Sequence, residues 1–331
     1  MRCALETYRQ KQYPEIVAGL PIQRFKKIVF TGMGSSFFVC NNAVTLLRRN
    51  GFYAYSIPAS QLLHYEVESI DHDTLLVMVS QSGRSGEIVE LSEKLKGQCF
   101  ILALTNDAES PLGLASDCIL NLCIESEKAV STRTYLAPLL ILYIMAKVFT
   151  GTWKEELYFG IEDTITALEE SLNHFDAMST ELKAFLGNPP YISLIARGNS
   201  LSTSEAGALF IKEVAKYPSI AFDSGQFRHG PFEMLDKNFA SFIFAPSDKS
   251  YEMQIRLAGD IADRGGKVAL ITDEILPNRD NIFIIKQRYP VPELVDVINV
   301  VPVQLFGNYI AKHKGLEVGA FIYSNKITRI Q

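Results

Sequence analysis

The sequence has few cysteines and few histidines, and this shortage limits the metal chemistry that it can support. The five cysteines, at positions 3, 40, 99, 118 and 123, form no CxxC pair and no cysteine–histidine ligand spacing. We therefore expect no structural metal, and no motif asks for a cofactor. An odd number of scattered thiols is typical of proteins in a reducing cytosol.

Segments that direct a protein to a membrane are also lacking. The N-terminal stretch MRCALETYRQKQYPEI contains no apolar core of the kind found in signal peptides. The most hydrophobic run, residues 136–146, contains Pro138 and is shorter than the about 20 residues that a bilayer requires. This run predicts a buried helix, and we expect a cytoplasmic protein with no membrane partner.

Positive charge is not in excess. The 32 lysines and arginines are outnumbered by 37 aspartates and glutamates, for a formal net charge of −5. This balance argues against nucleic acid as a partner, because surfaces that bind nucleic acid are normally basic. It leaves room for a local pocket that binds an anion. The length of 331 residues is enough for two domains.

What the sequence does contain is a regular alternation of apolar runs and stretches with helical spacing. Continuous apolar, β-branched runs are typical of parallel strands that are buried on both faces. The sequence therefore predicts an α/β fold in which helices cover a parallel sheet. The predicted strands are residues 26–34, 52–59, 74–83, 99–107 and 117–124, and then 190–200, 219–225, 239–248, 267–274 and 281–286.

This order of elements occurs twice, which indicates two copies of one α/β unit. We expect a first domain over residues 1–155, a helical connector over 156–186, and a second domain over 187–331 that ends in an extended tail. The corresponding positions are Gly32 and Gly198, Ser80 and Ala245, and Asn106 and Thr272, at offsets of 166, 165 and 166 residues.

Hydroxyl-rich loops follow two strands of the first half, GMGSS (32–36) and SQSGRS (80–85). Ligands of open parallel sheets bind outside the carboxyl ends of the strands, and each loop leads into a helix whose N-terminus attracts an anion. Phe37 stands where the dinucleotide fingerprint needs glycine, and no P-loop lysine follows. The pair favours a small phosphate, although each loop alone could be a helix cap. The candidate ligands are Ser35, Ser36, Ser80, Gln81, Ser82 and Ser85.

The second half differs, because its loops ARGNS and APSD are poorer in hydroxyls and predict that one phosphate site has been lost. A helix predicted from Ser204 to Lys216 carries Glu213 on its apolar stripe. Burial would raise the pKa of such a carboxyl toward the range of a general base, although a surface glutamate paired with a lysine remains an alternative. His229 precedes Gly230 in a sharp turn, where by itself it is more often a solvated loop histidine.

The segments GMGSS, SQSGRSGE, AVSTRTY and GALFIKE…DSGQFRHGP resemble those of SIS (sugar isomerase) domain proteins, in the same tandem order and over nearly the whole chain. They are similar to the isomerase half of glucosamine-6-phosphate synthase and to fructosamine-6-phosphate deglycases. The resemblance implies two tandem SIS domains, each a parallel-sheet α-β-α sandwich. It also implies that the six loop residues bind phosphate and that Ser131 contacts the sugar.

The same resemblance implies three catalytic residues. Glu213 matches a glutamate that moves a proton between C1 and C2, and His229 matches a histidine that opens the sugar ring from the partner subunit. Lys326 matches a tail lysine that forms an imine with the ketose. Shared active sites of this kind imply a homodimer or a dimer of dimers.

Two departures from the synthase favour a different function, although Lys326 argues for the isomerase. Phe210 stands where the synthase has a lysine, and the glutaminase domain has no counterpart, since Arg2 rather than cysteine follows Met1. We therefore expect a deglycase that splits a 6-phosphorylated fructosamine, with a phosphosugar or amino-sugar isomerase as the alternative. A non-catalytic phosphosugar sensor is a third reading, which Glu213 and His229 argue against.

Overall fold

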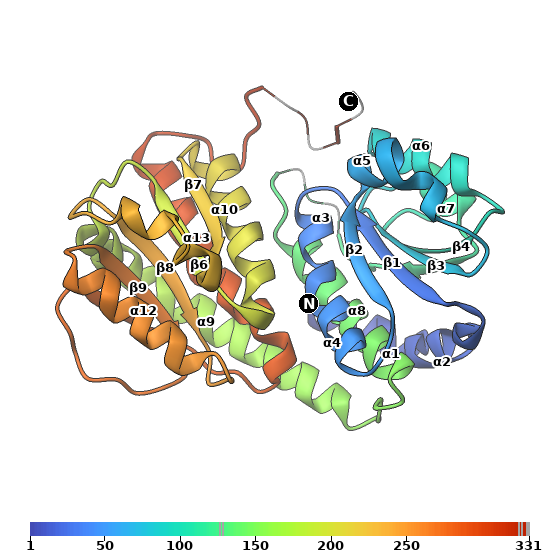
Figure 1. The fold of residues 1–331 in the computed structure, drawn as a ribbon, viewed down its shortest axis with the longest axis horizontal. Coiled ribbons are helices and arrows are strands. Elements are labelled where there is room, and N and C mark those ends of the chain that lie inside the picture. Colours follow the sequence, from blue (N-terminus) through green and yellow to red (C-terminus); the bar gives the residue numbers. More distant parts are fainter. Residues whose placement is uncertain (126, 128, 324, 326, 329–331) are drawn as a thin grey trace. The chain divides into compact units, whose positions relative to one another are not determined.

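The computed structural model describes residues 1–323 except 126 and 128, together with 325, 327 and 328, and only the backbone of 174–177 (Figure 1). The chain forms two compact units. The first comprises residues 1–158 and the described residues of 321–331, and the second comprises residues 159–320. Each unit is built around one sheet of parallel strands.

The sheet of the first unit has the order β2-β1-β3-β4-β5. Its central strand β3 is buried at every position, which explains why its sequence TLLVMV shows no alternation. The parallel register pairs Gly32 with Pro58 on one side and with Val79 on the other. The strands are β1 (Lys27–Gly32), β2 (Ala54–Pro58), β3 (Thr74–Val79), β4 (Phe100–Thr105) and β5 (Cys118–Asn121).

Helices cover both faces of this sheet. Ile88 and Leu91 of α6 pack with Leu76 and Met78 of β3 in one apolar cluster. Helix α4 contacts β1 and β2, and α8 packs against α4. The hydrophobic run 136–146 forms the middle of α8 and is buried, as predicted. The helices are α1 (Arg2–Gln10), α2 (Tyr13–Ala18), η1 (Ile22–Arg24), α3 (Ser35–Phe38), α4 (Cys40–Arg49), α5 (Ala59–Gln61), η2 (Leu62–Glu66), η3 (Val67–Ser69), α6 (Gly86–Leu95), α7 (Pro111–Ala115) and α8 (Arg133–Phe149).

The sheet of the second unit repeats this order, β10-β9-β8-β6-β7, when it is read from its other edge. Because β6, β7 and β8 take the places of β1, β2 and β3, the predicted repeat and the predicted α/β fold class are both confirmed. The strands are β6 (Ile192–Ala196), β7 (Ser219–Asp223), β8 (Ala240–Ala245), β9 (Lys267–Thr272) and β10 (Ile282–Lys286).

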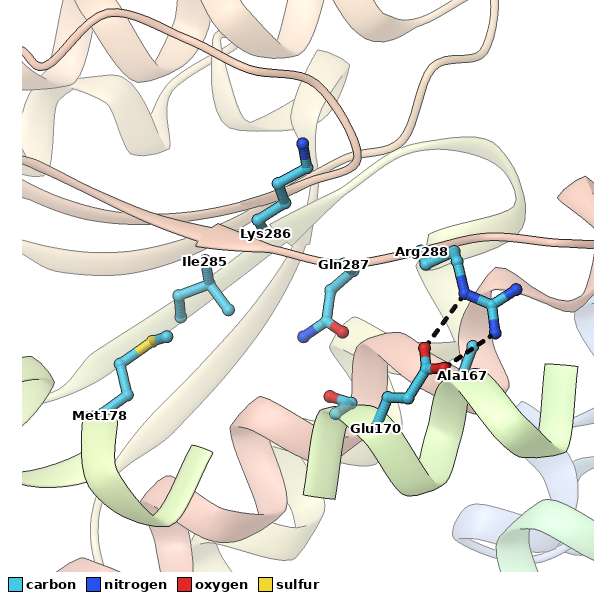
Figure 2. Close-up of a pocket in the computed structure, with 8 residues that line it drawn as sticks. Ala167, Glu170, Met178, Ile285, Lys286, Gln287 and Arg288 are labelled. Carbon is cyan, nitrogen blue, oxygen red and sulfur yellow. Dashed lines mark hydrogen bonds and ion pairs between the residues drawn. The ribbon is translucent and has the colours of Figure 1, made fainter. Parts of the chain in front are cut away.

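Among the helices of the second unit, the predicted connector forms a single helix, α9, which packs beside the end of β10. Arg288 binds Asp163 at 2.9 Å and Glu170 at 3.1 Å, and a pocket of about 240 Å³ lies between the two segments (Figure 2). The helices are α9 (Leu157–Leu186), η4 (Gly198–Ser200), α10 (Leu201–Ala215), α11 (Ser224–Phe227), η5 (Pro231–Met234), α12 (Tyr251–Asp263), η6 (Pro292–Leu294) and α13 (Val295–His313).

One stretch of the described residues, Pro292–His313, is long and apolar enough to cross a membrane, with a mean hydropathy of 1.4. It contains α13, which packs along α10, and 78% of the apolar window is buried inside the protein. A helix that is apolar on all sides is expected in the core of a large domain. Its composition is thus explained by its place in the core.

Candidate functional site

The two hydroxyl-rich loops of the first unit lie side by side. Strands β1 and β3 are parallel neighbours, and Gly32 pairs with Val79, so Met33 and Ser80 leave the sheet at the same edge. Gly32 allows the strand end to touch the next helix, because a Cβ there would lie 2.7 Å from the backbone oxygen of Ser36. The half-buried Ser35 and Ser36 therefore begin α3 directly above the sheet edge.

The second loop orients its own hydroxyls. Ser80 is buried, and its Oγ accepts a hydrogen bond from the Gly83 N–H at 3.2 Å. The Ser82 Oγ accepts from the Arg84 N–H at 3.2 Å. Each hydroxyl is held by a bond that it accepts, which leaves its proton to donate to a ligand. Ser85 is the N-cap of α6 but makes no capping bond with its side chain, so capping alone does not account for it.

Sequence reasoning missed the contact that ties this loop to the next strand. The Arg84 Nη2 lies 2.7 Å from Asp107 Oδ2, just beyond the end of β4. The Arg84 hydrogen bond lowers the pKa of the Asp107 carboxyl from its usual value, so the pair stays charged. No pattern in the sequence indicates it, because the two residues meet only when β3 and β4 pair.

Ser131 lies half-buried in the turn before α8, and a buried carboxylate holds this turn. Glu127 is 7% exposed and accepts hydrogen bonds from the N–H groups of Thr132 at 3.2 Å, Arg133 at 2.8 Å and Thr134 at 3.2 Å. Burial alone would raise the pKa of Glu127, but these bonds and those from both threonine hydroxyls lower it. Glu127 was missed as well, although an acidic residue shortly before a helix is a known signal.

The C-terminal tail reaches the start of α6, beside the loop that follows β3, within the first unit. The Gly86 N–H, in the first turn of α6, donates to the Thr328 carbonyl at 3.1 Å. The Thr328 carbonyl therefore already accepts the hydrogen bond of the backbone N–H group that follows Ser85. Lys326, the predicted imine-forming residue, lies outside the described residues.

In the second unit, Glu213 lies near the C-terminal end of α10, half-buried between the exposed Lys212 and the buried Val214. The Lys216 amine binds the Glu213 backbone carbonyl and, at 2.8 Å, the Ala320 carbonyl. The start of the tail is thus held next to the helix end that carries Glu213.

Phe210 lies one turn before Glu213 and is only 4% exposed. Its ring packs on α13, where a Cβ added to Gly307 would come within 3.2 Å of the ring. The position is therefore part of the α10–α13 interface, which is apolar.

His229 is exposed in the turn that follows β7, and its backbone N–H donates to the Gln226 carbonyl at 2.9 Å. The preceding short helix α11 is capped by Asp223, whose Oδ1 accepts from Gly225 N at 2.8 Å. Gly230 has a φ of 123°. Glycine adopts such positive φ values far more readily than other residues, so it permits the sharp turn here.

The structure does not bring Glu213 and His229 of one chain together. Glu213 precedes β7 and His229 follows it, so the two residues lie beyond opposite ends of this strand. The strand between them, Ser219–Asp223, itself spans roughly 16 Å. Within the part of the chain that the structure describes, no three His, Cys, Asp or Glu side chains are grouped so that they could hold a metal ion.

Known proteins with this arrangement were found by sequence and by structure. A glutamine–fructose-6-phosphate aminotransferase [isomerizing] of Pyrococcus horikoshii is 27% identical over 312 residues, which cover 92% of this chain and 52% of that protein. Its Aquifex aeolicus counterpart is 26% identical over 306 residues, which cover 90% of this chain and 50% of that protein. The chain thus spans about half the length of these relatives.

Solved structures have the same fold. The C-terminal domain of glucosamine-fructose-6-phosphate aminotransferase from Francisella tularensis superposes with a TM-score of 0.81 at 22% identity, covering 93% of this chain and 96% of that one. The tagatose-6-phosphate ketose/aldose isomerase of Escherichia coli has a TM-score of 0.77 at 18% identity, covering 98% and 92%. The model of the SIS domain matches residues 22–148 and 186–310, and the chain therefore belongs to the SIS domain family.

Proposed function

We propose that this chain is an enzyme that acts on a 6-phosphorylated fructosamine and releases an aldose 6-phosphate and a free amine. The 6-phosphate would bind the loops after β1 and β3, where Ser35, Ser36, Ser80, Gln81, Ser82 and Ser85 supply donors. Support comes from the neighbouring exits of these loops and from their oriented hydroxyls. Ser131 would contact the sugar from the turn that Glu127 holds.

The chemistry needs one base at the C1–C2 bond. In the substrate, nitrogen is bound to C1 and the carbonyl carbon is C2. Glu213 takes a proton from C1 to form an enaminol, and the same carbon pair is reprotonated at C2 to give an imine at C1. Water adds to this imine, and the amine leaves. His229 first moves a proton between the ring oxygen and the anomeric hydroxyl to open the ring. Each general acid–base step of this kind contributes typically about 10²–10⁴-fold.

The observation that carries the deglycase over a synthase-like reaction is the burial of Phe210. A lysine at this position would place an ammonium group in an apolar helix interface, which costs several kcal/mol. The chain therefore has no second amine one turn before its base. An enaminol can still form and collapse to an imine without that amine.

A phosphosugar isomerase is the second candidate, because the sequence relatives are named as isomerizing aminotransferases. Both reactions use a base at C1–C2, so Glu213 serves either. They differ in whether a nitrogen is released from C1 and in whether Lys326 forms an imine with a ketose.

The separation of Glu213 and His229 supports an active site that is shared between two copies of the chain. In a two-fold dimer, His229 of the partner subunit can approach Glu213, whereas His229 of the same chain lies at the other end of β7. We propose a homodimer, or a dimer of dimers, as the active form.

The deciding experiment supplies the full chain with 6-phosphorylated fructosamines carrying different amines. Release of glucose 6-phosphate is followed with a coupled dehydrogenase. A parallel reaction contains fructose 6-phosphate and borohydride. We expect amine release and no trapped adduct. A covalent adduct on Lys326 without any amine release would reverse the assignment in favour of the isomerase.

A further inference from the structure

A separate pocket of about 460 Å³ lies wholly within the second unit, outside the carboxyl ends of β6 and β7. Arg197 directly follows β6, whereas Ser224 and Arg228 follow β7. Helix α12 closes the pocket with residues at three- and four-residue spacing, which share one helix face. These residues are Met253, Arg256, Leu257 and Asp260.

The position of this pocket is meaningful in a sheet of this order. Strand β6 has β7 as its neighbour on one side and β8 on the other. The direction in which strands are added to the sheet therefore reverses between β6 and β8. Helix α12 is the helix that follows β8. Ligands of doubly wound sheets bind at this switch point. The hydroxyl-rich loops of the first unit follow β1 and β3, which are the corresponding strands.

The lining of the pocket carries an excess of positive charge. Arg228 Nη2 lies 2.6 Å from Asp260 Oδ2, so this pair is neutral. Among the described residues, Arg197 and Arg256 form no ion pair with a carboxylate. Arg197 contacts the Met253 sulfur at 3.1 Å, and Arg256 donates to the Glu252 carbonyl at 3.3 Å. Two guanidinium groups of the pocket lining are therefore not held in ion pairs within the described residues, which suits a dianion.

One residue of the pocket lining has a buried hydroxyl without a hydrogen-bond partner. Ser224 is 3% exposed, its Oγ has no hydrogen-bond partner, and the residue lines the pocket. A buried polar group left unsatisfied costs about 1–3 kcal/mol, which a ligand that accepts its proton would recover. Beside it, a Cβ on Gly225 would lie 2.4 Å from Arg197 Nη2. Glycine therefore lets the Arg197 guanidinium lie against this turn.

We propose that this pocket binds the phosphate group of a small phosphate monoester, at a site distinct from the loops of the first unit. Arg197, Arg256 and the Ser224 hydroxyl bind the phosphate oxygens. Asp260 holds Arg228 in place, and Met253 and Leu257 contact the organic part, for which the volume leaves room. The second repeat would then use guanidinium groups where the first uses hydroxyls, instead of having lost its anion site.

The test is the binding of inorganic phosphate and of glycerol 3-phosphate to the full chain, measured by isothermal titration calorimetry. We expect two sites in the unaltered chain. The double variant Arg197→Gln/Arg256→Gln should weaken one site about tenfold or more and keep the other. Ser82→Ala should do the reverse. Because binding requires no turnover, failure at one site is distinguishable from failure of the proposed function at the other.

Two further variants sharpen this test. Arg288→Gln is the matched control, because Asp163 and Glu170 already neutralise that arginine, and it should bind phosphate as the unaltered chain does. Gly225→Ala displaces the flexible end of Arg197 and also crowds Asp223 Oδ1, which would lie 2.9 Å from the new Cβ, so it should weaken the same site. If the unaltered chain binds only one phosphate and the double variant does not bind it, this result also supports phosphate binding in the pocket. Unchanged binding in the double variant, or tighter binding of succinate than of glycerol 3-phosphate, would overturn the proposal.

Discussion

Glu213 and His229 lie at opposite ends of strand β7, one before its first residue and the other beyond its last. A single chain therefore presents the proposed base and the proposed ring-opening histidine at different ends of this strand. If both residues act on one substrate, as proposed, we expect two copies of the chain to contribute one residue each. The proposed activity therefore depends on the formation of a dimer.

The first prediction follows from this geometry. Glu213→Gln and His229→Ala chains should each be inactive, whereas an equal mixture should regain activity after subunit exchange. In a dimer, half of the molecules are hybrids, and each hybrid has one intact site of two, so about a quarter of the original activity should return. The measurement is glucose 6-phosphate release.

Subunit exchange is verified in the same mixture with differently tagged chains. Absence of any recovered activity after exchange is complete would place both residues in the site of one chain.

The second prediction concerns the proposed phosphate-binding loops. Ser82→Ala should weaken fructose 6-phosphate binding about tenfold, since one donor to a charged group is lost. Ser35→Asp should abolish it through like-charge repulsion. Fluorescence-detected binding of fructose, which lacks the phosphate, serves as the comparison. Equal affinity of the unaltered chain for fructose and fructose 6-phosphate would contradict the assignment. Treatment with EDTA should leave activity unchanged.

The third prediction concerns Glu127, whose bonds to the start of α8 lower its pKa below the usual 4.5. A depressed pKa means that the stabilisation is present above pH 4.5 and is lost as the pH falls through the folded-state pKa. Glu127→Gln should therefore lower the free energy of unfolding by about 1–2 kcal/mol at pH 7, with the difference shrinking toward pH 3. Urea unfolding at both pH values measures this.

Glu125→Gln is the matched control for this prediction. Glu125 binds Arg133 at 2.7 Å, but its side chain is 85% exposed. A surface ion pair of this kind contributes little. A Glu125 variant that loses as much stability as the Glu127 variant would show that the loop charge, rather than the buried cap, matters.

The fourth prediction concerns Phe210. Replacing it with lysine should lower the free energy of unfolding by about 3 kcal/mol or more, because an amine replaces an aromatic ring in the α10–α13 interface. Phe210→Leu, which stays apolar, should cost clearly less. Thermal unfolding compares the two. A lysine variant as stable as the leucine variant would mean that the position opens to solvent, which would remove the main support for the deglycase.

The local parts of this fold could be read from the sequence. Continuous apolar runs such as TLLVMV predict strands buried on both faces, and Gly32 and Ser80 mark where strands end and loops begin. The nearly equal offsets between the halves indicate one unit repeated, because each copy buries its sheet in the same way. These signals work because they depend on neighbouring residues in the chain.

Other features depended on contacts between distant segments. Helix α10 begins at Leu201, earlier than the predicted Ser204, because Thr203 donates its N–H to Asp296 at 3.2 Å across 93 residues. The Arg84–Asp107 pair and the guanidinium pocket likewise join residues from different strands and helices. Hydrophobic periodicity determined that two sheets form and where their loops lie. Only the tertiary structure decided which charges meet at the sheet edges, because strand pairing and helix packing bring those side chains together.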